Sequence, residues 1–305
     1  MLVEHLIEPE FLTQVVSSRR NFNDFLREFS RQSPRVVGKL QKFSKFRKKT
    51  LQVQGEAVNE DQQTMLIELL QFIEETCLVD RNSGIDGNLS FLENCINAHQ
   101  QSPSHIFCLN EPAGQAVGGI GFIYSADLNN GINPLPNQKL VQKSLDEMVQ
   151  ATSDFLRLSS RITFVDPYFS HRAAMLNPMV KFIEFCGANS PVESKEITIL
   201  LKDRTDVPSI QFLMDAITTH NDFNSTGIAS LTVTSLKERD NGEALHNRYI
   251  ISELGALFWG IGLDERHSEV NDDVVMLNEE IFSKRFEQYC ELKAFDVSDS
   301  ANVTF

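Results

Sequence analysis

The stretch LHNRYIISELGALFWGIGLDER, residues 245–266, decides the fold of the second half of the chain. Its apolar runs RYIIS at 248–252 and ALFWGIGL at 256–263 are typical of two strands. His246 and Arg248 alternate along the entering strand, so both side chains point to the same face. A neutral imidazole can act as nucleophile or proton donor, and a guanidinium supplies fixed charge for phosphate oxygens. The pair therefore predicts a site that grips one phosphate, with chemistry that needs no metal.

Strands and helices alternate on both sides of this stretch. The pattern predicts strands at 161–167, 196–201, 228–234 and 274–277, and helices at 173–186, 208–220 and from 278 or 279 to 291. A long helix is expected from Leu140 to Leu156. Such alternation indicates an α/β layer with helices on the sheet faces. We place this domain at 136–292, followed by a tail at 293–305.

The stretch resembles the HxKx4D motif of the phospholipase D superfamily, with its downstream Gly-Ser-x-Asn element. His246 stands at the family's His, Arg248 at its Lys and Glu253 at its Asp. The other three positions of the family pattern, Gly, Ser and Asn, are occupied by Gly260, Ile261 and Leu263. The variant is most similar to the phospholipase D-like domain at the C-terminus of MIT-domain proteins and to related bacterial domains. The match covers about half of the chain.

The resemblance implies a mixed sheet flanked by helices and a metal-independent phosphodiesterase, above all a nuclease. In the family a histidine attacks phosphorus to form a phosphohistidine, a second histidine protonates the leaving group, and lysines bind the phosphate. Carried over, His246 is the nucleophile, Arg248 binds phosphate and Glu253 orients the histidine. Neither a metal nor another cofactor is implied. A fold does not establish a function, so a phosphodiesterase and a module that has lost the chemistry are both open.

Two residues depart from the family pattern. Ile261 removes a hydroxyl that helps to arrange the site, and Asp264 adds negative charge near the expected phosphate. These changes favour the alternative, a catalytically inactive scaffold or binding module that recognises an anionic lipid surface or a protein partner, as the resemblance to the MIT-associated domains implies. The kind of domain points to a bacterial defence or DNA-processing system.

The chain carries a single such motif, whereas the family's site has two histidines. A twofold homodimer would supply the second, because His246 of one chain would face its mate across an isologous interface. The sequence therefore predicts a homodimer.

Four further residues are candidates for lining the site: Asp166, His171, Arg172 and Asp264. Asp166 ends the strand at 161–167 and either orients a site residue or satisfies the turn that follows. His171 and Arg172 open the next helix and either line the cleft or face water. His246 itself has an alternative reading as a core histidine bonded to the backbone.

The first half of the chain predicts a mainly helical domain at 1–135 with a basic segment at 11–50. That segment has eleven Lys or Arg against Asp24 and Glu28, a formal charge of plus 9, although the whole chain carries minus 14. Apolar spacing predicts an amphipathic basic helix over 34–49. It would dock nucleic acid or an acidic protein partner through Arg35, Lys39, Lys42, Lys45, Arg47, Lys48 and Lys49. Short apolar runs at 106–109 and 116–125 are more typical of strands, and the segment at 129–138, rich in Asn, Gly and Pro, predicts a linker.

Composition narrows the remaining possibilities. The first residues carry Glu4, Glu8 and Glu10 where a signal peptide needs an uninterrupted apolar run. Apolar stretches are shorter than the roughly 20 residues of a membrane helix. Five widely spaced cysteines fit a reducing compartment better than disulfides or a zinc site. We therefore expect a cytoplasmic protein without a transmembrane segment.

Overall fold

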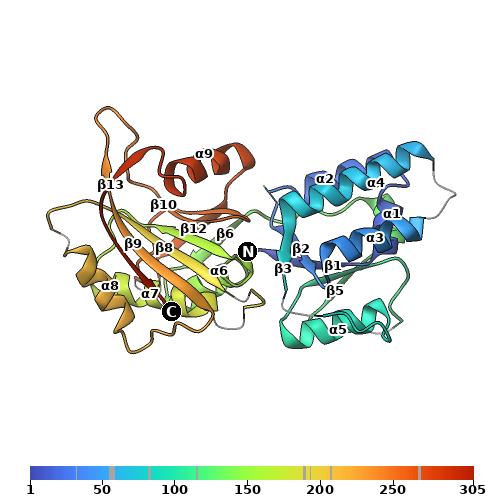
Figure 1. Cartoon of the computed structure of the whole chain (residues 1–305), viewed down its shortest axis with the longest axis horizontal. Coiled ribbons are helices and arrows are strands. Elements are labelled where there is room, and N and C mark those ends of the chain that lie inside the picture. The colour runs from blue at the N-terminus through green and yellow to red at the C-terminus, as the bar shows by residue number, and fades with distance from the viewer. Residues whose placement is uncertain are drawn as a thin grey trace. The chain divides into compact units, whose positions relative to one another are not determined.

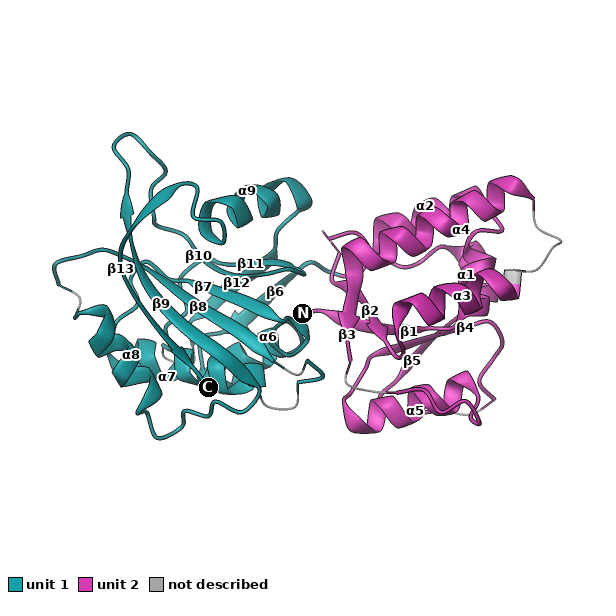
Figure 2. Cartoon of the chain, viewed as in Figure 1, with its two compact units in different colours: residues 1, 136–305 teal, residues 2–135 magenta. Residues whose placement is uncertain are grey.

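The computed structural model describes residues 1–31, 33–54, 59–81, 84–114, 116–187, 190–192, 194–206, 208–266 and 269–305. The chain divides into two compact units (Figures 1 and 2). The first comprises Met1 with Pro136–Phe305, and the second comprises Leu2–Leu135. The division falls inside the expected linker at 129–138. We call them unit 1 and unit 2.

Unit 2 is an α/β layer, so the prediction of a mainly helical domain is wrong. Its described strands form one sheet in the order β3-β2-β1-β4-β5, with every neighbouring pair parallel. The strands are β1 (Val3–Ile7), β2 (Arg35–Lys39), β3 (Leu78–Asp80), β4 (Ile106–Leu109) and β5 (Gly121–Tyr124). They are only three to five residues long, so periodicity does not reveal β1, β2 and β3. The strands expected at 106–109 and 116–125 are found as β4 and β5.

Helices cover both faces of the unit 2 sheet (Figure 1). Alternation along β1 sends Ile7 into one apolar cluster and Leu6 into another. The first cluster joins the sheet to the helices α1 (Pro9–Val15), α2 (Arg19–Glu28), α3 (Phe43–Gln54) and α4 (Glu60–Phe72). The second joins it to α5 (Phe91–Gln101). The π-helical turn η1 (Ile73–Cys77) leads into β3, and the 3₁₀ turn η2 (Ser125–Asn130) follows β5.

The basic helix over 34–49 is also a wrong prediction. Residues 35–39 form strand β2 between β1 and β3, and the helix begins only at Phe43. As successive strand residues, Val36 and Val37 bury one side chain on each face of the sheet, whereas a helix would place both on one face. β-branched residues suit this pleated, two-sided environment.

Unit 1 is built on a mixed sheet in the order β13-β9-β8-β7-β10-β11-β12-β6. The central strands β7 (Arg161–Val165), β8 (Lys195–Lys202) and β9 (Ile228–Glu238) are parallel. Strand β10 (Arg248–Ser252) pairs antiparallel with β7 and with β11 (Gly255–Trp259), which continues to β12 (Asn271–Met276) and β6 (Gln138–Gln142). The coarse expectation of an α/β fold is confirmed.

The helices of unit 1 are α6 (Leu145–Leu158), α7 (Ala173–Gly187), α8 (Ile210–Thr218) and α9 (Glu279–Tyr289). α9 packs on one sheet face through Phe282 and Tyr289, which join a cluster with Tyr249 and Ile251 of β10. α6 and α7 pack together, and α7 and α8 contact β8 and β9. Trp259 is fully buried, as expected of a core residue.

Two boundary predictions in unit 1 are wrong. The expected long helix from Leu140 is strand β6 followed by α6, which begins at Leu145 after Ser144. The expected tail at 293–305 contains strand β13 (Phe295–Thr304), which pairs antiparallel with β9 along the sheet edge. Its sequence FDVSDSANVT is mostly polar because an edge strand leaves one side in water, so it lacks an apolar signal.

Candidate functional site

A polar cleft of about 330 Å³ lies where β7 and β8 end and β10 begins. Its walls are formed by Tyr168, Ser170, His171, Arg172, Met175, Arg204, Asp206 and Arg248. Three arginines from separate segments thus converge on one hollow: Arg172 just before α7, Arg204 after β8 and Arg248 at the start of β10. Asp206 offsets one of these charges, since its carboxylate lies 2.5 Å from a terminal nitrogen of Arg204. The remaining guanidinium charge suits an anion.

His246 lies beside this cleft and is held by Tyr168. The Nδ1 atom of His246 is 2.7 Å from the Tyr168 hydroxyl, and the two rings meet edge to face. The imidazole is exposed, so the alternative reading as a core histidine is wrong. A proton on Nδ1 donated to the tyrosine oxygen leaves Nε2 with its lone pair, the state a nucleophile needs.

Arg248 packs on the same tyrosine. Its guanidinium carbon lies 4.6 Å from the centre of the Tyr168 ring, and that of Arg204 lies 5.5 Å from the same ring. Within the part of the chain that the structure describes, the buried Nε of Arg248 has no hydrogen-bond partner. One imidazole and two cations therefore lie around the single ring of Tyr168.

Asp166 is buried next to the cleft. It both satisfies the turn and orients a site residue, the two roles that the sequence left open. Its Oδ1 accepts a hydrogen bond from the Tyr168 backbone N–H at 3.0 Å, which closes the turn after β7. Burial raises the pKa of the Asp166 carboxyl, whereas that hydrogen bond and the nearby Arg248 oppose the rise. The carboxylate thus sets the position of Tyr168 and faces the arginine.

Asp264 has its charge largely balanced. Its Oδ2 lies 2.7 Å from Nε of Arg266, and its Oδ1 lies 3.8 Å from Nζ of the fully buried Lys143. Lys143 also donates to the carbonyl of Gly262, and burial lowers the pKa of its ammonium group. A Cβ on Gly262 would come within 2.8 Å of Asp264 and 3.5 Å of Arg248 Nε. The close contact with Asp264 and a φ of 140° both favour glycine at this position.

The expectation that Glu253 orients His246 is wrong. Glu253 follows the last residue of β10, and its carboxylate accepts hydrogen bonds from the Ser160 N–H at 2.6 Å and hydroxyl at 2.8 Å and from the Arg161 N–H at 3.1 Å. Strand geometry separates Glu253 from His246 by roughly 20 Å. Glu253 instead ties the beginning of β7 to the end of β10, a structural role.

His171 and Arg172 are exposed and line the cleft, so they both face water and form part of the cleft wall. The residues that the sequence did not single out are Tyr168, Arg204 and Lys143. Tyr168 lies two residues beyond Asp166 in the turn that ends β7, a position that strand ends commonly give to site residues. Nothing in their local pattern marks Arg204 or Lys143.

The expected basic surface of unit 2 is reduced to part of α3 and its flank. Arg35 is buried, so it is not available as predicted. Lys39 forms a partly exposed ion pair with Asp80. Arg47 is half-buried. Exposed positions remain at Lys42, Lys45, Lys48 and Lys49.

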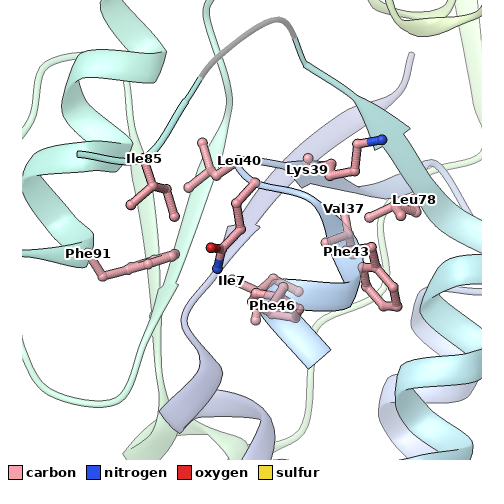
Figure 3. Close-up of a pocket in the computed structure, with 11 residues that line it drawn as sticks. Ile7, Val37, Lys39, Leu40, Phe43, Phe46, Leu78, Ile85 and Phe91 are labelled. Atoms are coloured by element: carbon pink, nitrogen blue, oxygen red, sulfur yellow. The ribbon is translucent and has the colours of Figure 1, made fainter. Parts of the chain in front are cut away.

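Unit 2 offers a second hollow that is much smaller. Figure 3 shows Phe43, Phe46 and Phe91 among the side chains around it. It holds about 20 Å³ and its lining is largely apolar, room for little more than one water. Across the described ranges, no three His, Cys, Asp or Glu side chains gather closely enough to ligate a metal ion. The cleft of unit 1 is the better candidate site.

No family model and no curated protein matches the chain. Among solved structures, the chain is similar to TrmBL2, an archaeal chromatin protein whose structure shows a novel mode of DNA binding, with 14% identity and a TM-score of 0.29. The alignment spans 55% of each chain, so about half of that protein is compared. None of the helices that the structure describes is both long and apolar enough to span a bilayer. The resemblance to phospholipase D stays a prediction, and a TM-score this low carries no argument about function.

Proposed function

We propose that unit 1 is a phosphodiesterase that cleaves nucleic acid through His246 without a metal ion. The observation that carries the proposal is the contact of 2.7 Å between His246 Nδ1 and the Tyr168 hydroxyl beside a cleft lined by three arginines. It combines an oriented imidazole with a place for a phosphodiester anion.

The reaction proceeds in two displacements. Nε2 of His246 attacks phosphorus while the bond from phosphorus to the leaving oxygen breaks, which forms a phosphohistidine. Water then attacks phosphorus and gives a proton to the group that protonated the leaving oxygen, the P–N bond breaks and His246 is restored. Arg248 and the other cleft arginines bind the phosphate oxygens as charge builds up on them.

The leaving oxygen must also receive a proton. His171 lines the same cleft, so a single chain offers a donor. The predicted homodimer offers another, His246 of a second copy across a twofold axis. Light scattering separates the two sources: a catalytically active monomer of 34.5 kDa would remove the need for a second copy, and an active dimer that loses activity on dilution would support it.

The proposal is tested by incubating wild type and His246→Ala with labelled single-stranded and double-stranded DNA and RNA in EDTA between pH 5 and pH 8. We expect cleavage by wild type and its loss in the variant, with unchanged circular dichroism because His246 is exposed. Cleavage that persists in His246→Ala, or that EDTA abolishes, would contradict the mechanism.

A binding module without turnover is the second candidate, and one observation favours it. Ile261 occupies the position of the family's hydroxyl, and its backbone N–H is bound to both carboxylate oxygens of Asp272 at 3.0 Å, so this loop brings no side-chain donor to the cleft. An inactive wild type that still binds oligonucleotides in an Arg248-dependent way would establish this function instead.

A further inference from the structure

An aromatic pair lies at the edge of the cleft. The His171 ring, which forms part of the cleft wall, meets the Phe212 ring edge to face, with 5.6 Å between centroids and 89° between planes. Phe212 is 50% exposed. The His171 side chain therefore lies between the exposed Phe212 ring and the proposed phosphate site.

The exposure of Phe212 is fixed by the helix that carries it. α8 turns Ile210, Leu213, Met214 and Ile217 into the core, which leaves position 212 on the outer side. The Phe212 N–H is bound to the Ser209 hydroxyl at 3.3 Å, so the first turn of the helix is capped. The core is complete without the phenyl ring, which has ring surface left for another partner.

We propose that Phe212 stacks an unpaired nucleobase whose phosphate lies in the arginine cleft, so that the substrate is single-stranded nucleic acid. This rests on the proposed function of the cleft. Every nucleobase has a π-face, and aromatic platforms bind single strands by stacking successive bases. A duplex hides those faces in its own stack, and a phospholipid headgroup has none.

The charge of the chain supports a contact with the base. At a formal charge of minus 14, the protein as a whole repels a polyanion, and attraction to the backbone is confined to local patches. A cleft with three arginines holds one or two phosphates. Stacking on Phe212 adds affinity that does not depend on charge, next to the His171 wall of the arginine cleft.

The test measures binding by fluorescence anisotropy in EDTA, with labelled oligothymidine and full-length protein. His246→Asn serves as the background so that the strand is not cleaved. In that background we expect Phe212→Ala to weaken binding by about tenfold or more, and Phe212→Trp to retain it. The matched control is Ile281→Ala, which removes a 42% exposed apolar side chain from α9 and should leave binding unchanged.

A strand of the same length made of stable abasic sites separates stacking from phosphate binding. It should bind the background protein more weakly than oligothymidine and show no further loss with Phe212→Ala. Equal effects of Phe212→Ala on both strands, or no effect on either, would overturn the inference. Tighter binding to a duplex or to vesicles of anionic lipid would overturn it as well.

The abasic strand also reports on the proposed function by itself. If wild type cleaves it and His246→Asn does not, the phosphodiesterase stands whatever Phe212→Ala does. If nothing is cleaved but Phe212→Ala weakens only the binding of oligothymidine, the stacking site stands and the catalytic proposal fails.

Discussion

Arg35 in unit 2 and Arg248 in unit 1 have neighbours of the same kinds, but Arg35 is buried and Arg248 is partly exposed. Each begins a strand, and each lies beside a histidine and an aromatic ring. A terminal nitrogen of Arg35 lies 2.7 Å from Nε2 of His5, and its guanidinium carbon lies 5.8 Å from the centre of the Phe29 ring. The whole group is buried, so it is closed to any guest.

Arg35 also has partners on other sides. It donates to the carbonyl of Asn133 and lies 3.9 Å from the carboxylate of Glu28. Arg248, by contrast, is only half-buried and lines an open cleft. The difference teaches that a pair of Arg and His indicates a binding site only where burial and partners leave donors available.

The largest expected effect separates the two arginines by stability. Arg35→Ala leaves His5 and the Asn133 carbonyl without their buried donor, and breaking such a buried group costs about 3 to 5 kcal/mol. Arg248→Ala should cost about 1 kcal/mol or less, because the side chain borders water. Urea unfolding of both variants, followed by circular dichroism, checks the contrast. Equal destabilisation would show that the two arginines play the same structural role.

The reverse contrast is expected in activity. Arg248→Ala removes a cation that binds the phosphate as charge develops, so we expect kcat/KM to fall by about 100-fold or more. Arg248→Lys keeps the charge and loses the planar fork, and should recover only part of that loss. Lys48→Ala on α3 serves as the control because it removes an exposed charge outside the cleft. An equal loss in Lys48→Ala would break the comparison.

The sequence correctly places Arg248 at the cleft but wrongly predicts that the buried Arg35 binds a partner, and the reason is physical. His246 and Arg248 are two residues apart on one strand, so alternation alone brings them together. His5 and Arg35 lie on β1 and β2, which are separated by two helices along the chain, and their contact exists only because the strands pair in parallel. The same limit applies to the cleft: Asp166 is close to its turn in sequence, whereas Arg204 reaches it only through the pairing of β7 with β8.

The contribution of the buried His5 to stability should also depend on pH. Burial, with Arg35 close by, lowers the pKa of His5 from 6.5 to about 3. Between pH 6.5 and pH 3, His5 is therefore protonated in the unfolded chain but neutral in the folded chain. This contribution to stability is complete above pH 6.5 and is lost as the pH falls. Between pH 7 and pH 5 we expect a loss of about 2 kcal/mol.

The control for this effect is His5→Gln, which can keep an acceptor for Arg35 but has no proton to gain. Unfolding in urea at pH 7, 6 and 5 should give a shallower pH dependence for His5→Gln than for wild type. Parallel curves for the two proteins would show that His5 does not titrate in this way.

The smallest expected effect concerns the aromatic ring of the open site. Phe29 contacts Arg35 and His5 through its ring alone, whereas Tyr168 also has a hydroxyl that holds Nδ1 of His246. Tyr168→Phe keeps the ring surface under Arg248 and removes one hydrogen bond, so the imidazole is free to turn. We expect kcat to fall about tenfold with KM nearly unchanged, since one such bond contributes about 1 kcal/mol or somewhat more. A purely structural ring would leave both the rate and its pH profile as they are, whereas a positioning tyrosine should shift the acid limb of that profile together with the rate.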